Sequence, residues 1–140
     1  MKILKYTILT ISIVLLALGW AGFARSAWYS SDWSYRQEIT INSSQVAETA
    51  SDFPLLCTTT MDVLKYDSFS GGHVARSTGG DIIFTDSDGT TLLDFEREYY
   101  ASSTGELVSW IKSGISSTSD RTIYMYYGNN SLAADLSTTT

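Results

Sequence analysis

Short runs in which apolar and polar residues alternate recur along this chain, and turn-forming residues separate them. In the run from residue 35 to 41 the odd-numbered and even-numbered side chains lie on opposite sides of an extended strand. Beyond residue 26 no run has the spacing of an amphipathic helix, and only 62–66 suits a single helical turn. Five further runs have strand character: 53–60, 81–85, 92–100, 106–113 and 121–128. The pattern predicts an all-β fold, an antiparallel, jelly-roll-like β-sandwich.

The first 26 residues have the composition of an export signal. Lys2 and Lys5 form a short basic start, and an uncharged, strongly apolar run follows. Ala24 and Ser26 then offer small side chains for a cut before Ala27. We expect an apolar signal helix over 1–26, with an uncleaved membrane anchor as the alternative. Either alternative places the rest of the chain outside the cytoplasm, in a secreted, periplasmic or cell-surface protein whose only membrane contact is this segment.

Residues 27–131 are expected to form one domain, and 132–140 a polar tail or the start of a linker. From Ala27 onward the chain carries 6 basic and 15 acidic residues, a net charge of −9. Such a balance excludes a nucleic-acid binder, which must neutralise phosphates, and disfavours an anionic membrane surface. The single Cys57 allows no internal disulfide and suits a small buried residue in a strand.

The stretch from Asp81 to Tyr100 is rich in acidic residues, with Asp86 and Asp88 next to Gly89. An EF-hand alignment that places Gly89 at position six puts phenylalanine at positions one and twelve, where oxygen ligands are needed. Asp-Gly between two strand-like runs instead predicts a hairpin turn. A weaker alternative is a structural calcium ion bound by Asp86 and Asp88.

Three carboxylates, Asp94, Glu96 and Glu98, alternate along one face of the next run. Neighbours in such a row are about 6.5 Å apart, a spacing that a glycosidase pair can have. A glycosidase also needs a cleft and a carboxyl group with a raised pKa, which an open, solvated strand face does not supply. His73 lies in a Gly-rich loop without a nucleophile motif. We therefore expect no enzymatic activity, and a glycoside hydrolase is the weakest hypothesis.

Aromatic residues are the other chemically informative group. Exposed rings on a flat sheet can stack against sugar rings, whereas buried rings serve core and cross-strand packing. The candidate ligand-binding residues are Trp33, Tyr35, Trp110, Tyr124 and Tyr126.

A series of motifs resembles a known family. The motifs are WSYR and ITI from residue 33 to 41, DFPL at 52–55, DIIFTDSDGTTLL at 81–93, Glu96, STGELV at 103–108 with Trp110 and Lys112, TIY at 122–124, and YYGN at 126–129. Together they resemble the bacterial and archaeal family called domain of unknown function 2341, over a span from about Trp33 to Asn130.

The resemblance implies an exported, β-rich module. It also implies frequent neighbours: a concanavalin-like lectin or glucanase domain, or a TolQ/ExbB-type proton-channel domain at the end of a large protein. No catalytic residue is implied. The leading hypothesis is a non-catalytic extracytoplasmic binding or adhesion module for polysaccharide. The alternative is a structural or assembly module that contacts another domain of a cell-envelope protein.

Overall fold

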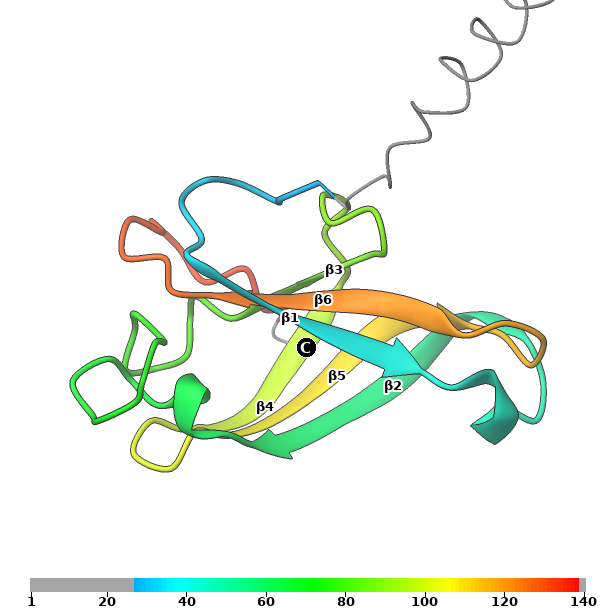
Figure 1. The fold of residues 1–140 in the computed structure, drawn as a ribbon, viewed down its shortest axis with the longest axis horizontal. Coiled ribbons are helices and arrows are strands. Elements are labelled where there is room, and N and C mark those ends of the chain that lie inside the picture. The colour runs from blue at the N-terminus through cyan, green and yellow to red at the C-terminus, as the bar shows by residue number, and fades with distance from the viewer. Residues whose placement is uncertain (1–26, 139–140) are drawn as a thin grey trace, which may run out of the picture.

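The computed structural model describes residues 27–138 and contains two antiparallel sheets. One sheet has the strand order β1-β6-β3 and the other β2-β5-β4, so β6 and β5 are the central strands (Figure 1). These two sheets confirm the predicted all-β, antiparallel fold. The strands are β1 (Tyr35–Ile41), β2 (Ala50–Thr60), β3 (Ile83–Thr85), β4 (Phe95–Ala101), β5 (Glu106–Ile115) and β6 (Arg121–Tyr127).

Two segments are short 3₁₀ turns, Ser43–Gln45 and Asp62–Leu64, and the second falls where a single helical turn was predicted. No helix within residues 27–138 has the length and apolar character needed to cross a bilayer. The predicted signal helix over 1–26 lies outside the described residues.

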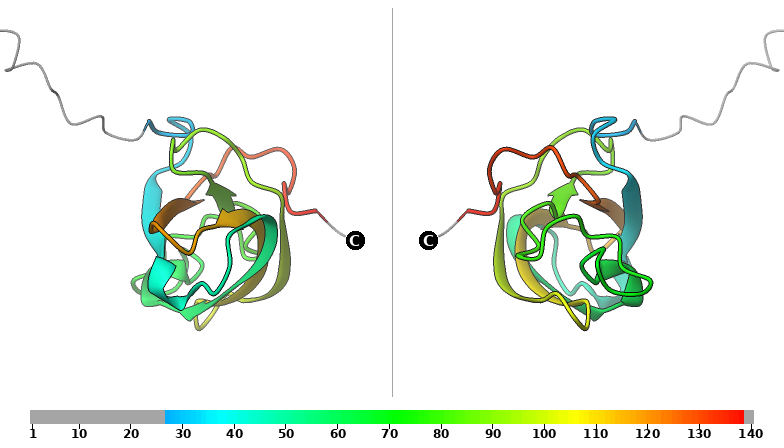
Figure 2. Two further views of the ribbon diagram at one scale, coloured as in Figure 1. Left: turned by 90° about the vertical axis from the view of Figure 1, so that its right-hand side faces the viewer. Right: turned by 90° about the vertical axis from the view of Figure 1, so that its left-hand side faces the viewer.

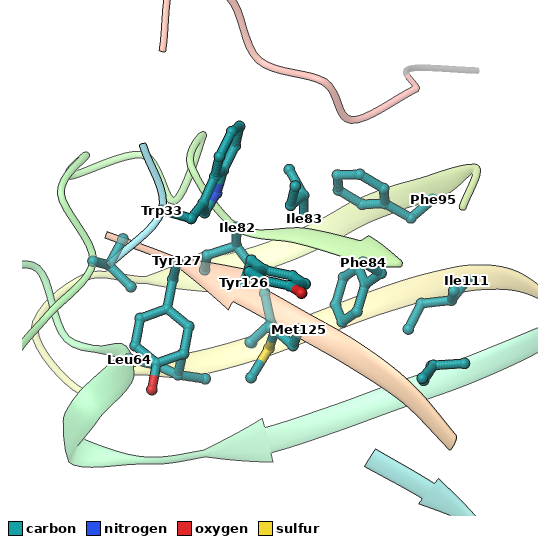
Figure 3. Close-up of a cluster of buried hydrophobic side chains, with 13 residues drawn as sticks. Trp33, Leu64, Ile82, Ile83, Phe84, Phe95, Ile111, Met125, Tyr126 and Tyr127 are labelled. Atoms are coloured by element: carbon teal, nitrogen blue, oxygen red, sulfur yellow. The ribbon is translucent and has the colours of Figure 1, made fainter. Parts of the chain in front are cut away.

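The core lies between the sheets and follows the two-residue alternation of the central strands. On β5, Leu107, Ser109 and Ile111 are buried, whereas Trp110 between them is exposed. Phe84 of β3 meets Phe95 of β4 edge-on, with ring centroids 5.3 Å apart, so this pair joins the two sheets (Figure 3). Such edge-to-face pairs stabilise a core beyond the area that they bury.

The Asp88-Gly89 turn forms as predicted and closes a short hairpin between residues 84–86 and 91–93, but β3 and β4 do not pair along their lengths. Gly89 has a φ of +77°, and the main chain closes through Asp86 N–H to the Thr91 carbonyl at 2.9 Å. Beyond the single bridge between Thr85 and Leu92, the chain crosses to the other sheet. The crossing places Phe95 against Phe84 across the core, so that their contact joins the two sheets.

A β-bulge interrupts the alternation of side chains along β4. The register shifts between Arg97 and Tyr99, so Tyr99 is 50% exposed and Tyr100 points inward instead. The Tyr100 hydroxyl donates to the Leu64 carbonyl at 2.7 Å. Desolvation raises the pKa of Tyr100, the charge of Asp81 raises it further, and Arg97 opposes the shift. Two-residue alternation in the sequence cannot reveal this bulge, because a bulge inserts one extra residue into one strand and shifts the faces of those that follow.

Arg97 points into the molecule, where its guanidinium donates to the Gly79 carbonyl and pairs with Asp135. Leu132 and Leu136 pack against the core, and Thr138 N–H donates to the Phe95 carbonyl at 2.8 Å. The segment expected to be a polar tail thus covers the outer edge of β4. The sequence pattern did not predict this packing.

Loops 42–49 and 116–120 lie at one end of the sandwich, and the long segment between β2 and β3 lies at the other (Figures 1 and 2). Cys57 faces the core from β2, and its partial burial raises the pKa of the thiol. This placement agrees with the small inward-facing residue predicted for it.

Asp81 is fully buried just before β3 and connects segments that are distant in sequence. Its carboxylate accepts four main-chain N–H groups, two from the 75–76 loop and two from residues 128–129, at 2.8–3.2 Å. Its carbonyl accepts the indole N–H of Trp33 at 2.9 Å. A buried carboxylate is tolerable only when its oxygens are satisfied in this way.

We predict that Asp81→Asn lowers the free energy of unfolding by about 3 kcal/mol, because an amide replaces one acceptor oxygen with a donor that faces N–H groups. Urea denaturation followed by circular dichroism measures the change. Asp94→Asn, at an exposed position, should alter stability by less than about 0.5 kcal/mol. Equal stability of the two variants would contradict the role given to Asp81.

Candidate functional site

The five aromatic residues predicted to bind ligand do not lie together. Trp33 is 5% exposed and belongs to the core. Tyr126 is fully buried, and its hydroxyl donates to the Gly89 carbonyl at 3.0 Å and accepts from Tyr29 N–H. Neither ring is available to a ligand in this structure.

Tyr35 and Tyr124 lie in the β1-β6-β3 sheet, as Tyr126 does, and each already has a partner for its ring. Tyr35 is 39% exposed, and its ring stacks against those of His73 and Tyr127, with centroid-to-centroid distances of 4.3 Å and 5.5 Å. The guanidinium of Arg36 lies 4.2 Å from the centroid of Tyr124, a cation–π distance. Segment 27–29 and Arg36 thus occupy much of the outer side of the β1-β6-β3 sheet.

Trp110 differs from the other four because it stands on an open sheet face. It lies on the central strand β5 and points away from the core, with Leu56 of β2 and Glu96 of β4 opposite it in the register. Trp110 is 39% exposed, and its indole N–H donates to the Glu98 carboxylate at 2.7 Å. A central strand and this hydrogen bond hold the ring in one orientation.

We call the surroundings of this ring the Trp110 face. They combine exposed apolar groups with acidic groups, and the two largest apolar neighbours, Leu56 and Tyr99, are 47% and 50% exposed. The sequence did not indicate Leu56 and Tyr99, because alternation and turn residues do not show which face of a sheet stays uncovered. The face comprises Asp52, Pro54, Leu56, Asp94, Glu96, Glu98, Tyr99, Val108, Trp110 and Lys112.

A shallow groove of about 330 Å³ runs beside Trp110. Asp94 and Glu96 form part of its lining, and Lys112 pairs with Asp52 across 3.5 Å. Phe95, Ile111 and Thr138 also line the groove, so the packed C-terminal segment helps to shape it. The three acidic residues predicted on the solvated face of β4 therefore border this groove or the Trp110 ring.

The carboxylates of Asp86 and Asp88, the weak calcium candidates, are engaged by other groups of the protein, through an ion pair and hydrogen bonds respectively. Asp86 pairs with Arg121 at 2.7 Å. Asp88 accepts from Thr90 N–H, Thr91 N–H and the Thr91 hydroxyl at 2.6–2.8 Å. Within residues 27–138 no group of three or more His, Cys, Asp or Glu side chains is arranged to hold a metal ion.

Two larger cavities lie where the sheets open. One, of about 550 Å³, is lined mainly by apolar residues, among them Ile41, Val46, Phe53, Leu55 and Ile115, between the edge strands β1 and β2. The other, of about 570 Å³, adjoins it and is lined mainly by hydroxyl groups together with Asp120 and Arg121. We call the apolar cavity the β1/β2 mouth.

Comparison with known proteins supports the motif-based expectation. Residues 78–139 match the family described as Domain of unknown function (DUF2341), which confirms the predicted resemblance over the stretch that carries β3 to β6. Asp81, Trp110 and the carboxylates of β4 all fall inside the matched stretch. No match was found among curated proteins or among solved structures.

The hydrogen bonds to Asp88 lower the pKa of its carboxyl from 3.8 to about 2, with the Thr91 hydroxyl as the largest cause. A carboxyl group whose pKa is lower in the folded than in the unfolded chain stabilises the fold at pH values above its unfolded-state pKa. This contribution is lost as the pH falls through its folded-state pKa. We predict that the stability difference between the wild type and Asp88→Ala is constant near neutral pH and shrinks between about pH 4 and pH 2.

Denaturant midpoints measured from pH 2 to pH 7 test this prediction. Asp94→Ala is the matched control, since its carboxylate makes no hydrogen bond within residues 27–138. A difference for Asp88→Ala that stays constant down to pH 2 would show that the turn does not depend on this ionised side chain.

Proposed function

We propose that this domain is a non-catalytic, extracytoplasmic binding module and that the Trp110 face binds carbohydrate. One observation carries the proposal: a tryptophan on a central strand is 39% exposed, with its indole N–H held by Glu98. A large aromatic side chain left exposed on a rigid sheet, beside a groove, has no role in the core and is available to a ligand.

The chemistry of the face suits a sugar ring. The apolar C–H side of a pyranose can pack on the indole, while its hydroxyl groups donate to carboxylates at the rim. Asp94 and Glu96 line the groove directly beside Trp110. The sheet scaffold fixes these groups before binding, which reduces the entropy lost on association.

Export and the family relationship are consistent with this role. The basic and apolar start of the chain and the small residues before Ala27 support secretion or display on the cell surface. The lectin-like neighbours implied for the family support a carbohydrate-related role. Jelly-roll-like sandwiches are a common lectin architecture, and we propose this finer description for the two sheets.

A second candidate function is assembly within a cell-envelope protein, and the β1/β2 mouth favours it. β1 and β2 are edge strands, and Phe53 on β2 is 41% exposed beside an apolar cavity. Exposed edge strands can pair with a strand of another protein. Glycoside hydrolysis remains the weakest proposal, because Asp94, Glu96 and Glu98 border an open face and not an enclosed cleft.

We predict that Trp110→Ala weakens binding of cello-, chito- or xylo-oligosaccharides at least about tenfold, which corresponds to about 1.4 kcal/mol. Isothermal titration calorimetry measures the affinity of each oligosaccharide. Trp28→Ala is the matched control, because Trp28 is 43% exposed but packs against Tyr126 on the other sheet. Identical affinities for the wild type and Trp110→Ala would exclude this face as the binding site.

The assembly alternative predicts a different result. A chain that associates through the β1/β2 mouth should show a sedimentation coefficient that rises with concentration or with an added envelope-protein domain, and Phe53→Glu should abolish the rise. A monomer at every concentration, with no cross-linked partner in envelope extracts, would count against assembly.

A further inference from the structure

We infer that the Trp110 face selects sugars that carry an ammonium group, the amino sugars, over neutral or N-acetylated sugars of the same backbone. This inference rests on the proposed carbohydrate-binding function and names the substrate class of the same site. It follows from the charges that surround the exposed indole.

The charge of the face is strongly one-sided. Four carboxylates, those of Asp52, Asp94, Glu96 and Glu98, stand around the ring, and Lys112 is the single basic residue of the face. Lys112 is paired with Asp52, and the other charged residues of the face, Asp94, Glu96 and Glu98, are all acidic. A neutral sugar can donate hydroxyl groups to these carboxylates but gains no charge–charge attraction from them, and an acidic sugar is repelled.

The positions of these carboxylates match a ligand stacked on the indole. Glu96 lies directly across from Trp110 in the strand register, and Glu98 is hydrogen-bonded to the indole itself. Asp94 lines the groove together with Glu96. Substituents at the edge of a sugar ring on Trp110 therefore meet carboxylates, and an ammonium group there can also interact with the electron-rich face of the indole.

A sugar is favoured over a basic polypeptide by the composition and size of the face. The centres of protein–protein interfaces are depleted in charged residues, whereas here the carboxylates adjoin the central tryptophan. The groove of about 330 Å³ lies at the small end of the range for small-molecule sites. A groove of this size suits one or two sugar rings.

The test compares glucosamine oligomers with N-acetylglucosamine oligomers of equal length, by calorimetry at about pH 6 and low salt. We expect the glucosamine oligomer to bind about tenfold more tightly, and this preference to shrink at about 1 M salt, where charges are screened. The double variant Asp94→Asn, Glu96→Gln should weaken binding of the glucosamine oligomer far more than binding of the N-acetylated oligomer, so that the preference is lost. Lys112→Gln should strengthen binding of the glucosamine oligomer alone.

Glu38→Gln is the control, because Glu38 is an exposed acidic residue on the other sheet, and both affinities should stay unchanged. Circular dichroism verifies that each variant is folded. Equal affinity for the two oligomers would overturn the selectivity while leaving the proposed function intact. A preference that survives in the double variant would overturn its assignment to these carboxylates. Trp110-dependent binding of an oligolysine peptide without binding of either oligomer would overturn both proposals.

Discussion

The buried carboxylate of Asp81 is the interaction on which the arrangement of the sheets depends. It accepts N–H groups from the 75–76 loop and from the end of β6, while its carbonyl accepts the Trp33 indole ahead of β1. It therefore fixes the end of β6 and the entry to β3 and β1, the three strands of one sheet. With that sheet in place, Phe84 can pack against Phe95 and position the second sheet. The Trp110 face is the outer side of this second sheet.

The two outer sheet faces differ, and this difference gives the molecule its candidate site. On the β1-β6-β3 sheet, Arg36 and residues 27–29 contact Tyr124 and Tyr126. On the β2-β5-β4 sheet, the groove beside Trp110 is shaped by Thr138 but the ring remains exposed. The β2-β5-β4 sheet thus carries an exposed indole beside the carboxylates of Glu96 and Glu98. The two proposed roles use different places on the molecule: ligand binding would use the Trp110 face, and assembly would use the β1/β2 mouth.

The strands could be predicted from sequence because short strand-like runs, several of them with two-residue alternation, lie between turn residues. All six were found close to their expected positions. Pairing could not be predicted, since alternation says which side chains share a face but not which strand lies alongside. The Asp88-Gly89 turn therefore suggested a hairpin, although its flanking strands belong to different sheets. The bulge at Arg97–Tyr99 exposes Tyr99 and turns Tyr100 inward, the reverse of what unbroken alternation from Phe95 would give. Of the five candidate aromatic residues, Trp110 alone stands on the proposed binding face, because burial depends on tertiary packing.

We propose that the ligand meets the domain at Trp110 and the neighbouring carboxylates of Asp94, Glu96 and Glu98. The most direct measurement is a titration of the isotopically labelled domain with glucosamine oligomer, followed by amide and indole N–H chemical shifts in NMR spectra. The account predicts that the Trp110 indole N–H and the amides of residues 94–99 and 108–112 shift together, with saturation at a common concentration. Shifts confined to the β1/β2 mouth, or no shifts at saturating oligomer, would contradict it.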